Sequence, residues 1–453
     1  MDDKLIYIDC GEKCLKFAQK EGIDHAEIYI TNSRAISAEI EKGSMKNAQQ
    51  FYDHGISIRA VKDRSVGFSF STDFEWNKLE KMVLTAVKLS KTGTSDPDFR
   101  DFAHHASYPH ITGIFDKKIA TIDITTLMEY CLRTASSAQI DKRISSINVN
   151  LICGTTERIL LNTNDINVNT DTTAIRLYSQ IAATENSETS SGFEFQSSRF
   201  LKINPEQVGK TAAEMALKSL HAQNIETGNY PVIFHPYAVA ILFTSAIGTA
   251  TNAEAVQYKR SYLTNQKDKK IGIDFFEILD NGLYVDSNGI AGLGTSKCDG
   301  EGVPKQKTPL ISEGFLKNYL YDTYTAGKVG CHSTGNSSRS TYRTTPSIQI
   351  SNLQVLGQSG DLDSFISETK NGILVYYTAD RPNIATGDFS GLISEGFKIE
   401  NGSIAHPLKK AMFGINMLDF FKQIYAIGTD YRQVYQVITP SLCVSNVKVA
   451  GAK

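Results

Sequence analysis

Residues 55–72, GISIRAVKDRSVGFSFST, decide the fold of the first part of this chain. Apolar and polar residues alternate on both sides of the polar turn at residues 62–64, which is typical of two half-buried antiparallel strands. The same alternation occurs upstream in AEIYIT, from Ala26, and in SAEIEKG, from Ser37. With further polar turns predicted at residues 42–44 and 53–55, we expect four short strands in one small antiparallel sheet.

Helical periodicity flanks these strands and marks a first unit at residues 1–90. Residues 3–20 and 74–89 space their apolar side chains as amphipathic helices do, so we expect both helices to pack on the sheet. Residues 91–116 are rich in Gly, Pro, Asp and His without either period. We predict that they form a linker.

A central unit at residues 117–222 and a third unit at residues 228–453 follow. The elements expected in the central unit are a helix at 122–138, alternating strands at 145–154, 156–164, 166–186 and 190–198, and a helix from Pro205 onward. The third unit is mostly short strands, with helices expected near 237–251, 361–370 and 413–427. We therefore predict an α+β protein, with an N-terminal α/β lobe of two small sheet-plus-helix units and a strand-rich, barrel-like C-terminal domain.

The composition limits the partners and the compartment. Lys and Arg number 47 against 49 Asp and Glu, so no overall field draws the protein to nucleic acid or to an anionic membrane. The seven Cys are an odd number spread thinly, and the N-terminus lacks the pattern of a signal peptide. The most apolar stretch, residues 238–250, is shorter than the ~18–20 residues that cross a bilayer. We expect a cytoplasmic protein with neither a membrane nor a nucleic-acid partner.

No motif in the sequence provides a metal or nucleotide site by itself. The nine His and seven Cys form neither HExxH nor CxxC, and no P-loop is present. Cys331 and His332 place a thiol beside an imidazole, but a working pair usually comes from distant segments. The most distinctive segments are three Gly-rich stretches that can turn sharply and present main-chain N–H groups to a ligand, at residues 299–304, 333–336 and 386–390.

Taken in order, these segments resemble the TldD/PmbA family, proteins once called modulators of DNA gyrase and associated with a zinc-dependent peptidase. The matching pieces include GISIRAVKDRSVGFSFST, PVIFHPYAVAILFTSAIGTA from Pro231, CDGEGVPKQKTPLISEGF from Cys298, TGDFSG from Thr386 and PSLCVSNVKVAG from Pro440. The resemblance covers nearly the whole chain, and the order and spacing of many motifs make it specific.

The two branches of this family differ at a zinc site. The TldD-like branch carries HExxxH on the helix after the PVxF-like strand and a Cys near the C-terminus, which together bind zinc. At these positions this chain has Thr244, Ser245, Thr249 and Ile427. Neutral hydroxyls and an alkyl group do not hold Zn²⁺ as imidazole and thiolate do, and Ser245 lacks the basicity of a general base. The chain is therefore similar to the PmbA-like (TldE-like) branch, and we expect no catalytic residue, metal or cofactor in the chain itself.

The resemblance also implies a partner and a substrate. For the PmbA-like branch, the resemblance implies a heterodimer with a TldD-like subunit. That subunit would hold the zinc and cut unfolded peptides in a chamber that both subunits enclose. A homodimer is the alternative. The chain would then be a non-catalytic subunit in proteolysis or peptide maturation, holding an extended peptide at a sheet edge. Residues of the Gly-rich segments are candidates for peptide binding, namely His332, Ser333, Thr334, Asn336, Thr386 and Asp388.

Two other functions stay open on the sequence. One is a peptidase that works alone with groups such as Cys331, His332 or Asp388. The other is a regulatory or peptide-binding homodimer linked to DNA gyrase modulation, for which the basic segment 259–270 would be a docking surface.

Overall fold

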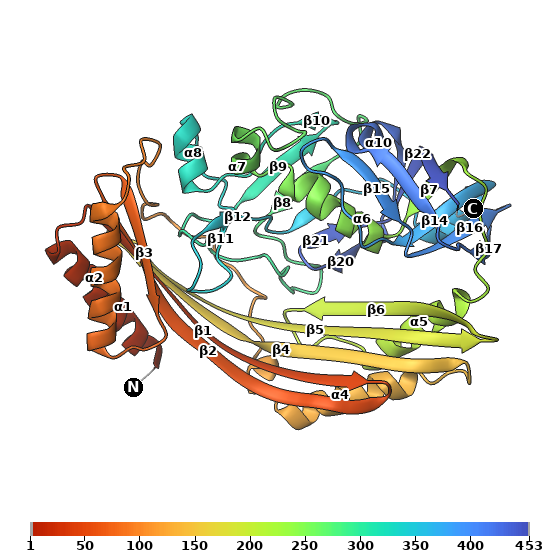
Figure 1. The fold of residues 1–453 in the computed structure, drawn as a ribbon, viewed down its shortest axis with the longest axis horizontal. Helices are drawn as coiled ribbons and strands as arrows, with labels where there is room; N and C mark the ends of the chain where they lie inside the picture. The colour runs from red at the N-terminus through yellow and green to blue at the C-terminus, as the bar shows by residue number, and fades with distance from the viewer. Residues whose placement is uncertain (1–2, 452–453) are drawn as a thin grey trace.

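The computed structural model describes residues 3–451, and a long, curved antiparallel sheet forms one side of the molecule (Figure 1). Its strand order is β3-β2-β1-β4-β5-β6. The strands are β1 (His25–Glu41), β2 (Ser44–Lys62), β3 (Ser65–Ser71), β4 (Ile144–Asn162), β5 (Asn167–Glu185) and β6 (Glu188–Ser198). The first two predicted units share this sheet, because β1 pairs with β4 from Glu27 opposite Asn162 to Ile40 opposite Val149.

The strands are longer than the sequence pattern predicts. The turn expected at residues 53–55 is absent, and Gly55 instead lies inside β2, opposite Thr31. This glycine allows a close approach, because a Cβ at this position would overlap the ring of Tyr342. In the same way, the two runs expected at 145–154 and 156–164 form the single strand β4.

The two faces of this sheet are buried against different partners. Ile28, Ile30 and Ile58 belong to an apolar cluster shared with the helices. Tyr29 and Leu160, which have the opposite parity, belong to a cluster that includes residues of the C-terminal domain. The period of two therefore separates one buried interface from another where the C-terminal domain covers the sheet, whereas in β5 from Ile175 to Ile181 it separates core from solvent.

Helices cover the face of the sheet that points away from the C-terminal domain (Figure 1). They are α1 (Asp3–Lys20), α2 (Trp76–Thr92), α3 (Lys117–Thr121), α4 (Ile124–Ser137) and α5 (Pro205–Lys218). The Asp123 carboxylate accepts a hydrogen bond from the Thr126 N–H and caps the start of α4, and Asn204 caps α5 in the same way through the Gln207 N–H. Between α2 and α3 the chain runs without helix or strand, and the boundaries expected at 90, 117, 222 and 228 stay predictions.

The C-terminal domain is built mainly from two further sheets. One has the order β15-β18-β22-β7-β14-β16-β17, with β19 pairing β22; the other has the order β10-β9-β8-β13-β21-β20, and β11 and β12 form a separate pair. The strands are β7 (Gly228–Phe234), β8 (Ile278–Asn281), β9 (Lys307–Ser312), β10 (Phe315–Leu316), β11 (Ser337–Ser338), β12 (Ser347–Ile348), β13 (Leu353–Val355), β14 (Asn371–Tyr377), β15 (Asp388–Leu392), β16 (Glu395–Glu400), β17 (Ser403–Pro407), β18 (Met412–Asn416), β19 (Ile424–Ile427), β20 (Arg432–Val434), β21 (Val437–Thr439) and β22 (Leu442–Ala450). The helices are α6 (Pro236–Phe243), the π-helix η1 (Thr244–Thr249), α7 (Ala253–Gln257), α8 (Thr323–Val329), α9 (Leu362–Glu368) and α10 (Met417–Gln423).

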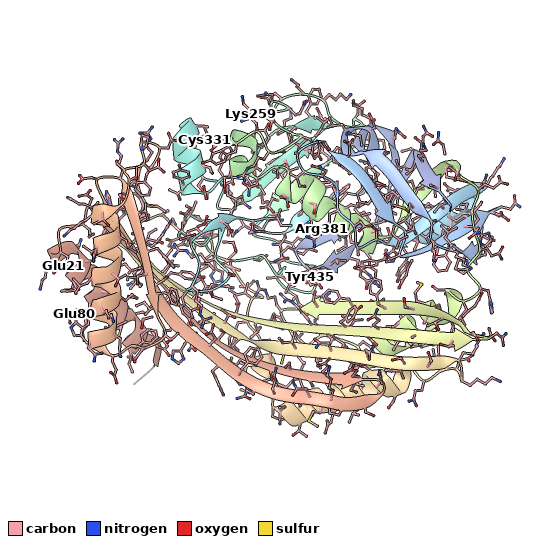
Figure 2. All side chains as sticks on the ribbon, viewed as in Figure 1. Glu21, Glu80, Lys259, Cys331, Arg381 and Tyr435 are labelled. Atoms are coloured by element: carbon pink, nitrogen blue, oxygen red, sulfur yellow. The ribbon has the colours of Figure 1, made fainter. Side chains whose placement is uncertain are left out.

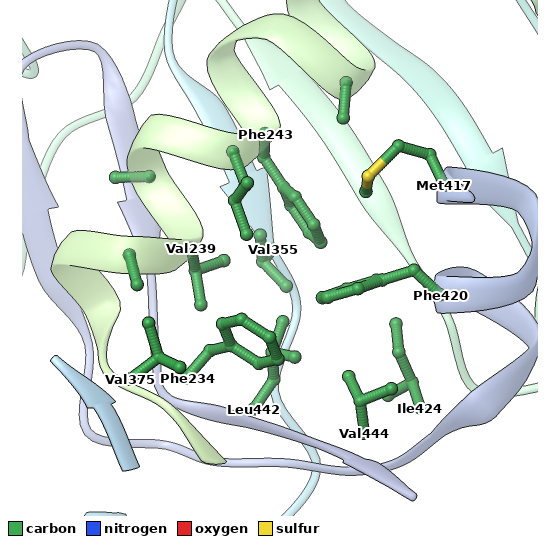
Figure 3. Packing of buried hydrophobic residues seen from close by; sticks show 14 of the residues in the cluster. Phe234, Val239, Phe243, Val355, Val375, Met417, Phe420, Ile424, Leu442 and Val444 are labelled. Atoms are coloured by element: carbon green, nitrogen blue, oxygen red, sulfur yellow. The ribbon is translucent and has the colours of Figure 1, made fainter. Parts of the chain in front are cut away.

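An apolar core around α6 holds this domain together (Figure 3). Phe243 of α6 lies 6.0 Å from Phe420 between ring centroids, and Phe420 lies 5.1 Å from Phe234 of β7. The predicted α+β class, with its α/β N-terminal lobe and strand-rich, barrel-like C-terminal domain, is confirmed. Within residues 3–451, no helix has both the length and the apolar character needed to cross a bilayer.

The packing of α2 on β3 leads to a stability prediction. A Cβ at Gly67 of β3 would overlap the carbonyl oxygen of Ala86 and lie 2.6 Å from the Ser90 nitrogen, both on the α2 backbone. We expect Gly67→Ala to lower the free energy of unfolding by about 1–3 kcal/mol, because the helix must shift to make room. Urea denaturation followed by circular dichroism measures this loss. Ser69→Ala on the same strand is the control and should change stability far less; equal stability of the two variants would contradict the packing.

Candidate functional site

A cavity of about 600 Å³ lies between the curved sheet and the C-terminal domain. Tyr29, Leu160 and Val168 form an apolar part of its wall on the sheet side. The C-terminal domain contributes side chains between residues 293 and 300 and between 337 and 350, many of them Ser or Thr. This volume is within the range of about 300–1,000 Å³ typical of small-ligand sites, so the cavity is the candidate functional site.

Four basic side chains line the cavity: Arg158 of β4, Arg199 just after β6, Lys305 and Arg339. The buried Arg199 guanidinium donates to main-chain carbonyls at Thr173, Gly292, Leu293 and Thr295, and among residues 3–451 no carboxylate pairs with it. Burial lowers the pKa of Arg199 to about 9, and the neighbouring positive charges of Arg158 and Arg176 add to the effect. The wall therefore carries a positive charge that no side chain neutralises.

A buried ion network beside the cavity joins the sheet to the C-terminal domain. Glu27 of β1 is fully buried; its carboxylate accepts from Arg59 of β2 at 2.8 and 3.0 Å and from Arg339 of the C-terminal domain. The Arg59 Nη2 also reaches Glu301 Oε1 at 3.1 Å. Burial alone raises the pKa of Glu27, but Arg339 and Arg59 together outweigh it and hold that pKa below its ordinary value.

The segment CDGEGVP shapes the acidic part of the site. The Asp299 carboxylate accepts main-chain N–H groups from Glu301 at 2.9 Å, Val303 at 3.0 Å and Ser337 at 3.0 Å. Gly302 makes the turn possible with φ of +87°. Burial and the neighbouring Glu301 raise the pKa of Asp299 to about 7. This loop therefore serves as a rigid connection between the cavity and the ion network.

The four positions that the resemblance aligns with the zinc site of TldD-like chains include three in η1, Thr244, Ser245 and Thr249, and one at the end of β19, Ile427. Thr244 lines the cavity, and its hydroxyl donates to the Ala240 carbonyl at 2.8 Å. Thr249 is exposed and its hydroxyl donates to the Thr244 carbonyl at 3.3 Å, whereas Ser245 is buried. Ile427 is fully buried in the apolar core.

These residues do not fit a zinc ion. Two hydroxyls already donate to carbonyls of their own helix, and none of the four side chains offers the imidazole or thiolate that Zn²⁺ requires. No group of three or more His, Cys, Asp or Glu side chains within residues 3–451 could hold a metal ion. The predicted helix at 237–251 is formed as α6 followed by the π-helix η1, a rare form that is frequent at functional sites.

The residues predicted to bind peptide lie outside the cavity wall in two separate places. His332 is exposed after α8, the Ser333 and Thr334 hydroxyls donate to the Tyr321 carbonyl, and buried Asn336 donates to Asp280 at 2.7 Å. Thr386 and Asp388 are exposed at the start of β15, where both accept from the Asn416 amide. Their role in peptide binding stays a prediction.

The thiol and imidazole of Cys331 and His332 do not form a catalytic pair in this structure. Cys331 is exposed at the outer surface beside α8 (Figure 2). Desolvation raises the pKa of its thiol, whereas a nucleophilic cysteine needs a lowered one. Within the described residues, no hydrogen bond joins this thiol to His332.

Sequence patterns did not identify the basic side chains of the cavity. Arg158 directly precedes the apolar run Ile159-Leu160-Leu161 in the same strand, and a charge beside that run was the available signal. Arg158 has the same parity as Leu160, so both face the cavity. Arg199 and Arg339 gave no comparable signal, because each follows a short strand that ends in serines.

Comparison with known families matches three consecutive segments of the chain. Residues 26–90 match PmbA/TldA metallopeptidase domain 1, residues 117–220 match the central domain, and residues 227–451 match the C-terminal domain. An uncharacterized protein of Methanocaldococcus jannaschii is 30% identical over 433 residues, which are 95% of this chain and 97% of that protein. The metalloprotease PmbA of Escherichia coli O157:H7 is 24% identical over 94% of this chain and 92% of its own length.

Solved structures share the fold. TldE from Thermococcus kodakarensis matches with a TM-score of 0.89 at 22% identity, covering 98% of this chain and 100% of that chain. A Bacteroides thetaiotaomicron protein whose name is modulator of DNA gyrase matches with a TM-score of 0.89 at 24% identity, over 100% of both chains.

The ion network gives a prediction on stability and pH. Glu27→Gln leaves Arg59 and Arg339 short of a buried counter-charge, so we expect the free energy of unfolding at pH 7 to fall by about 3–5 kcal/mol. Because the folded pKa of Glu27 lies below its ordinary 4.5, the stabilisation is complete above pH 4.5 and is lost as the pH falls through the folded value. Urea denaturation at several pH values measures both effects.

The matched control for this variant is Glu39→Gln on the same strand, whose side chain is partly exposed and pairs with Lys46. We expect the control to change stability by less than about 0.5 kcal/mol. A Glu27→Gln chain as stable as the control at pH 7 would show that the network does not join the two domains.

Proposed function

This chain belongs to the PmbA/TldA (TldD/PmbA) metallopeptidase family, and we propose that it is the non-catalytic subunit of a zinc metallopeptidase that acts on unfolded peptides. In this proposal a TldD-like partner supplies the zinc, which activates water for attack on the peptide bond. This chain completes the chamber and holds the substrate in it. Its place of action would be the cytoplasm.

One observation carries the proposal: Thr244 stands on the cavity wall with its hydroxyl already donated to the Ala240 carbonyl. The family resemblance puts the first zinc-binding His of TldD-like chains at this position. A threonine engaged in its own helix offers the metal no ligand. The fold thus keeps a cavity at this helix while the metal-binding side chains are replaced.

The chain's own residues are suited to holding a substrate rather than cutting it. The cavity wall combines apolar side chains such as Leu160 with hydroxyls and basic groups, which can bind and orient a peptide. The Asp299 carboxylate accepts three main-chain N–H groups, which hold it to its own loop. These features support a role in binding and positioning.

Metal content and activity test this proposal. We expect the purified chain to hold far less than one zinc per molecule by plasma mass spectrometry and to leave an unfolded reporter peptide intact. Adding a TldD-like chain with an intact HExxxH should give zinc-dependent cleavage that a chelator abolishes. One tightly bound zinc in the isolated chain, or cleavage by the isolated chain, would overturn the proposal.

A double variant separates this function from that of a peptidase working alone. Cys331→Ser with His332→Ala removes the thiol and the imidazole of the exposed segment. We expect the mixed subunits to keep their maximal rate of cleavage, since zinc in the partner does the chemistry; a role of His332 in holding the peptide would raise KM and leave that rate unchanged. A loss of all cleavage in this variant, with zinc still bound by the partner, would instead place the catalytic groups in this chain.

A further inference from the structure

The cavity contains two guanidinium groups that no carboxylate neutralises. Arg199 is 6% exposed and spends its N–H groups on main-chain carbonyls. Arg158 lines the same cavity and, within residues 3–451, makes no side-chain hydrogen bond or ion pair. Arg199 holds its charge in a buried, low-dielectric wall, which is costly without a counter-ion, whereas Arg158 is partly exposed and can contact a ligand; together they favour an anionic ligand.

The nearby carboxylates are already engaged elsewhere. Glu27 and Glu301 pair with Arg59 and Arg339. Asp280 accepts from Asn336 at 2.7 Å and from the Ser351 N–H at 2.7 Å, and Asp299 accepts main-chain N–H groups. The wall and the adjoining network hold five cations, Arg59, Arg158, Arg199, Lys305 and Arg339, against the four carboxylates Glu27, Asp280, Asp299 and Glu301, so one positive charge is left over.

Polar atoms without partners point to the same ligand. Arg339 is 5% exposed and its Nε has no hydrogen-bond partner, and Ser337 is 2% exposed with an unpartnered Oγ. Both residues line the cavity, together with Ser338 and Ser340. Buried donors are rarely left unpaired in folded proteins, so these two are suited to a ligand oxygen.

We propose that this cavity binds a carboxylate group of a peptide, with Arg158 as its direct contact and Ser337 and the Arg339 Nε as further donors. The planar Arg158 fork matches the two oxygens of a carboxylate. Arg199, whose N–H groups are engaged, adds positive charge without a contact. One free guanidinium suits a single negative charge better than the double charge of a phosphate. Tyr29, Leu160 and Val168 would pack against the neighbouring side chain of the peptide.

This proposal rests on the proposed function only because it takes the ligand to be a peptide. The binding site itself is formed by one chain. Either the C-terminal carboxylate or an Asp or Glu side chain supplies the required chemistry. The test therefore uses three versions of one fluorescein-labelled decapeptide of Ala, Ser and Gly: a free C-terminal acid, a C-terminal amide, and an amide with one internal Glu. Binding to the full-length chain is followed by fluorescence anisotropy at two salt concentrations.

We expect the acid to bind about tenfold more tightly than the amide, the gain typical of a charge-assisted contact, and the difference to shrink at high salt. Arg158→Gln should bring the acid to the affinity of the amide. Arg133→Gln, which removes an exposed guanidinium that pairs with Glu206 on the helix side of the sheet, is the control and should keep the tenfold difference. Circular dichroism and unfolding curves check that both variants fold.

The internal-Glu arm identifies the source of the carboxylate. Binding as tight as that of the acid means that the site accepts side-chain carboxylates as well; binding as weak as that of the amide means that it selects the peptide C-terminus. Equal binding of the acid and the amide, or no binding of either, overturns the proposed carboxylate site. This conclusion holds whether or not a mixture with a TldD-like chain cleaves peptides. Failure of a TldD-like chain to give cleavage overturns the proposed function and leaves the acid preference standing.

Discussion

The buried carboxylate of Glu27 is the interaction on which the architecture depends. It joins two arginines from different parts of the chain, Arg59 on the neighbouring strand and Arg339 in the C-terminal domain, and Glu301 completes the network. In a low-dielectric interior such a network is stable only when all its members are present together, because any lone charge is strongly penalised. The network thus requires the C-terminal domain to sit against the concave face of the sheet.

The sheet can accept this domain because part of it has apolar residues on both faces. Ile28, Ile30 and Ile58 pack under α1 and α2, while Tyr29 and Leu160 face the other way. At Gly55 the missing side chain lets the Tyr342 ring lie directly on β2. The cavity is the part of this interface that the side chains do not fill, and its wall therefore combines residues from both domains.

The chemistry of that wall is that of a binding site for an anion rather than of a metal site. Thr244 and Thr249 keep their hydroxyls within the helix, whereas Arg158 and Arg199 present positive charge without a counter-ion. Tyr435 lies on the side of the C-terminal domain that faces the sheet (Figure 2), and its contact with Phe195 and the pair of Arg432 with Glu194 join β20 and the residue after it to β6. A chamber-forming subunit that positions a peptide for a partner needs these properties and does not need a metal of its own.

The sequence by itself determined many of the local elements and which side chains stand at 244, 245, 249 and 427. Alternation at 55–72 and the amphipathic periods predicted strands and helices, and none of those four side chains is an imidazole, carboxylate or thiolate. Only the tertiary structure decided that Asp53-His54-Gly55 continues a strand, because the reason is a tyrosine ring hundreds of residues away. The same holds for the cavity: Arg158, Arg199 and Arg339 meet through long-range pairing of strands and loops, and neither periodicity nor motif spacing reports which charges lie together in space.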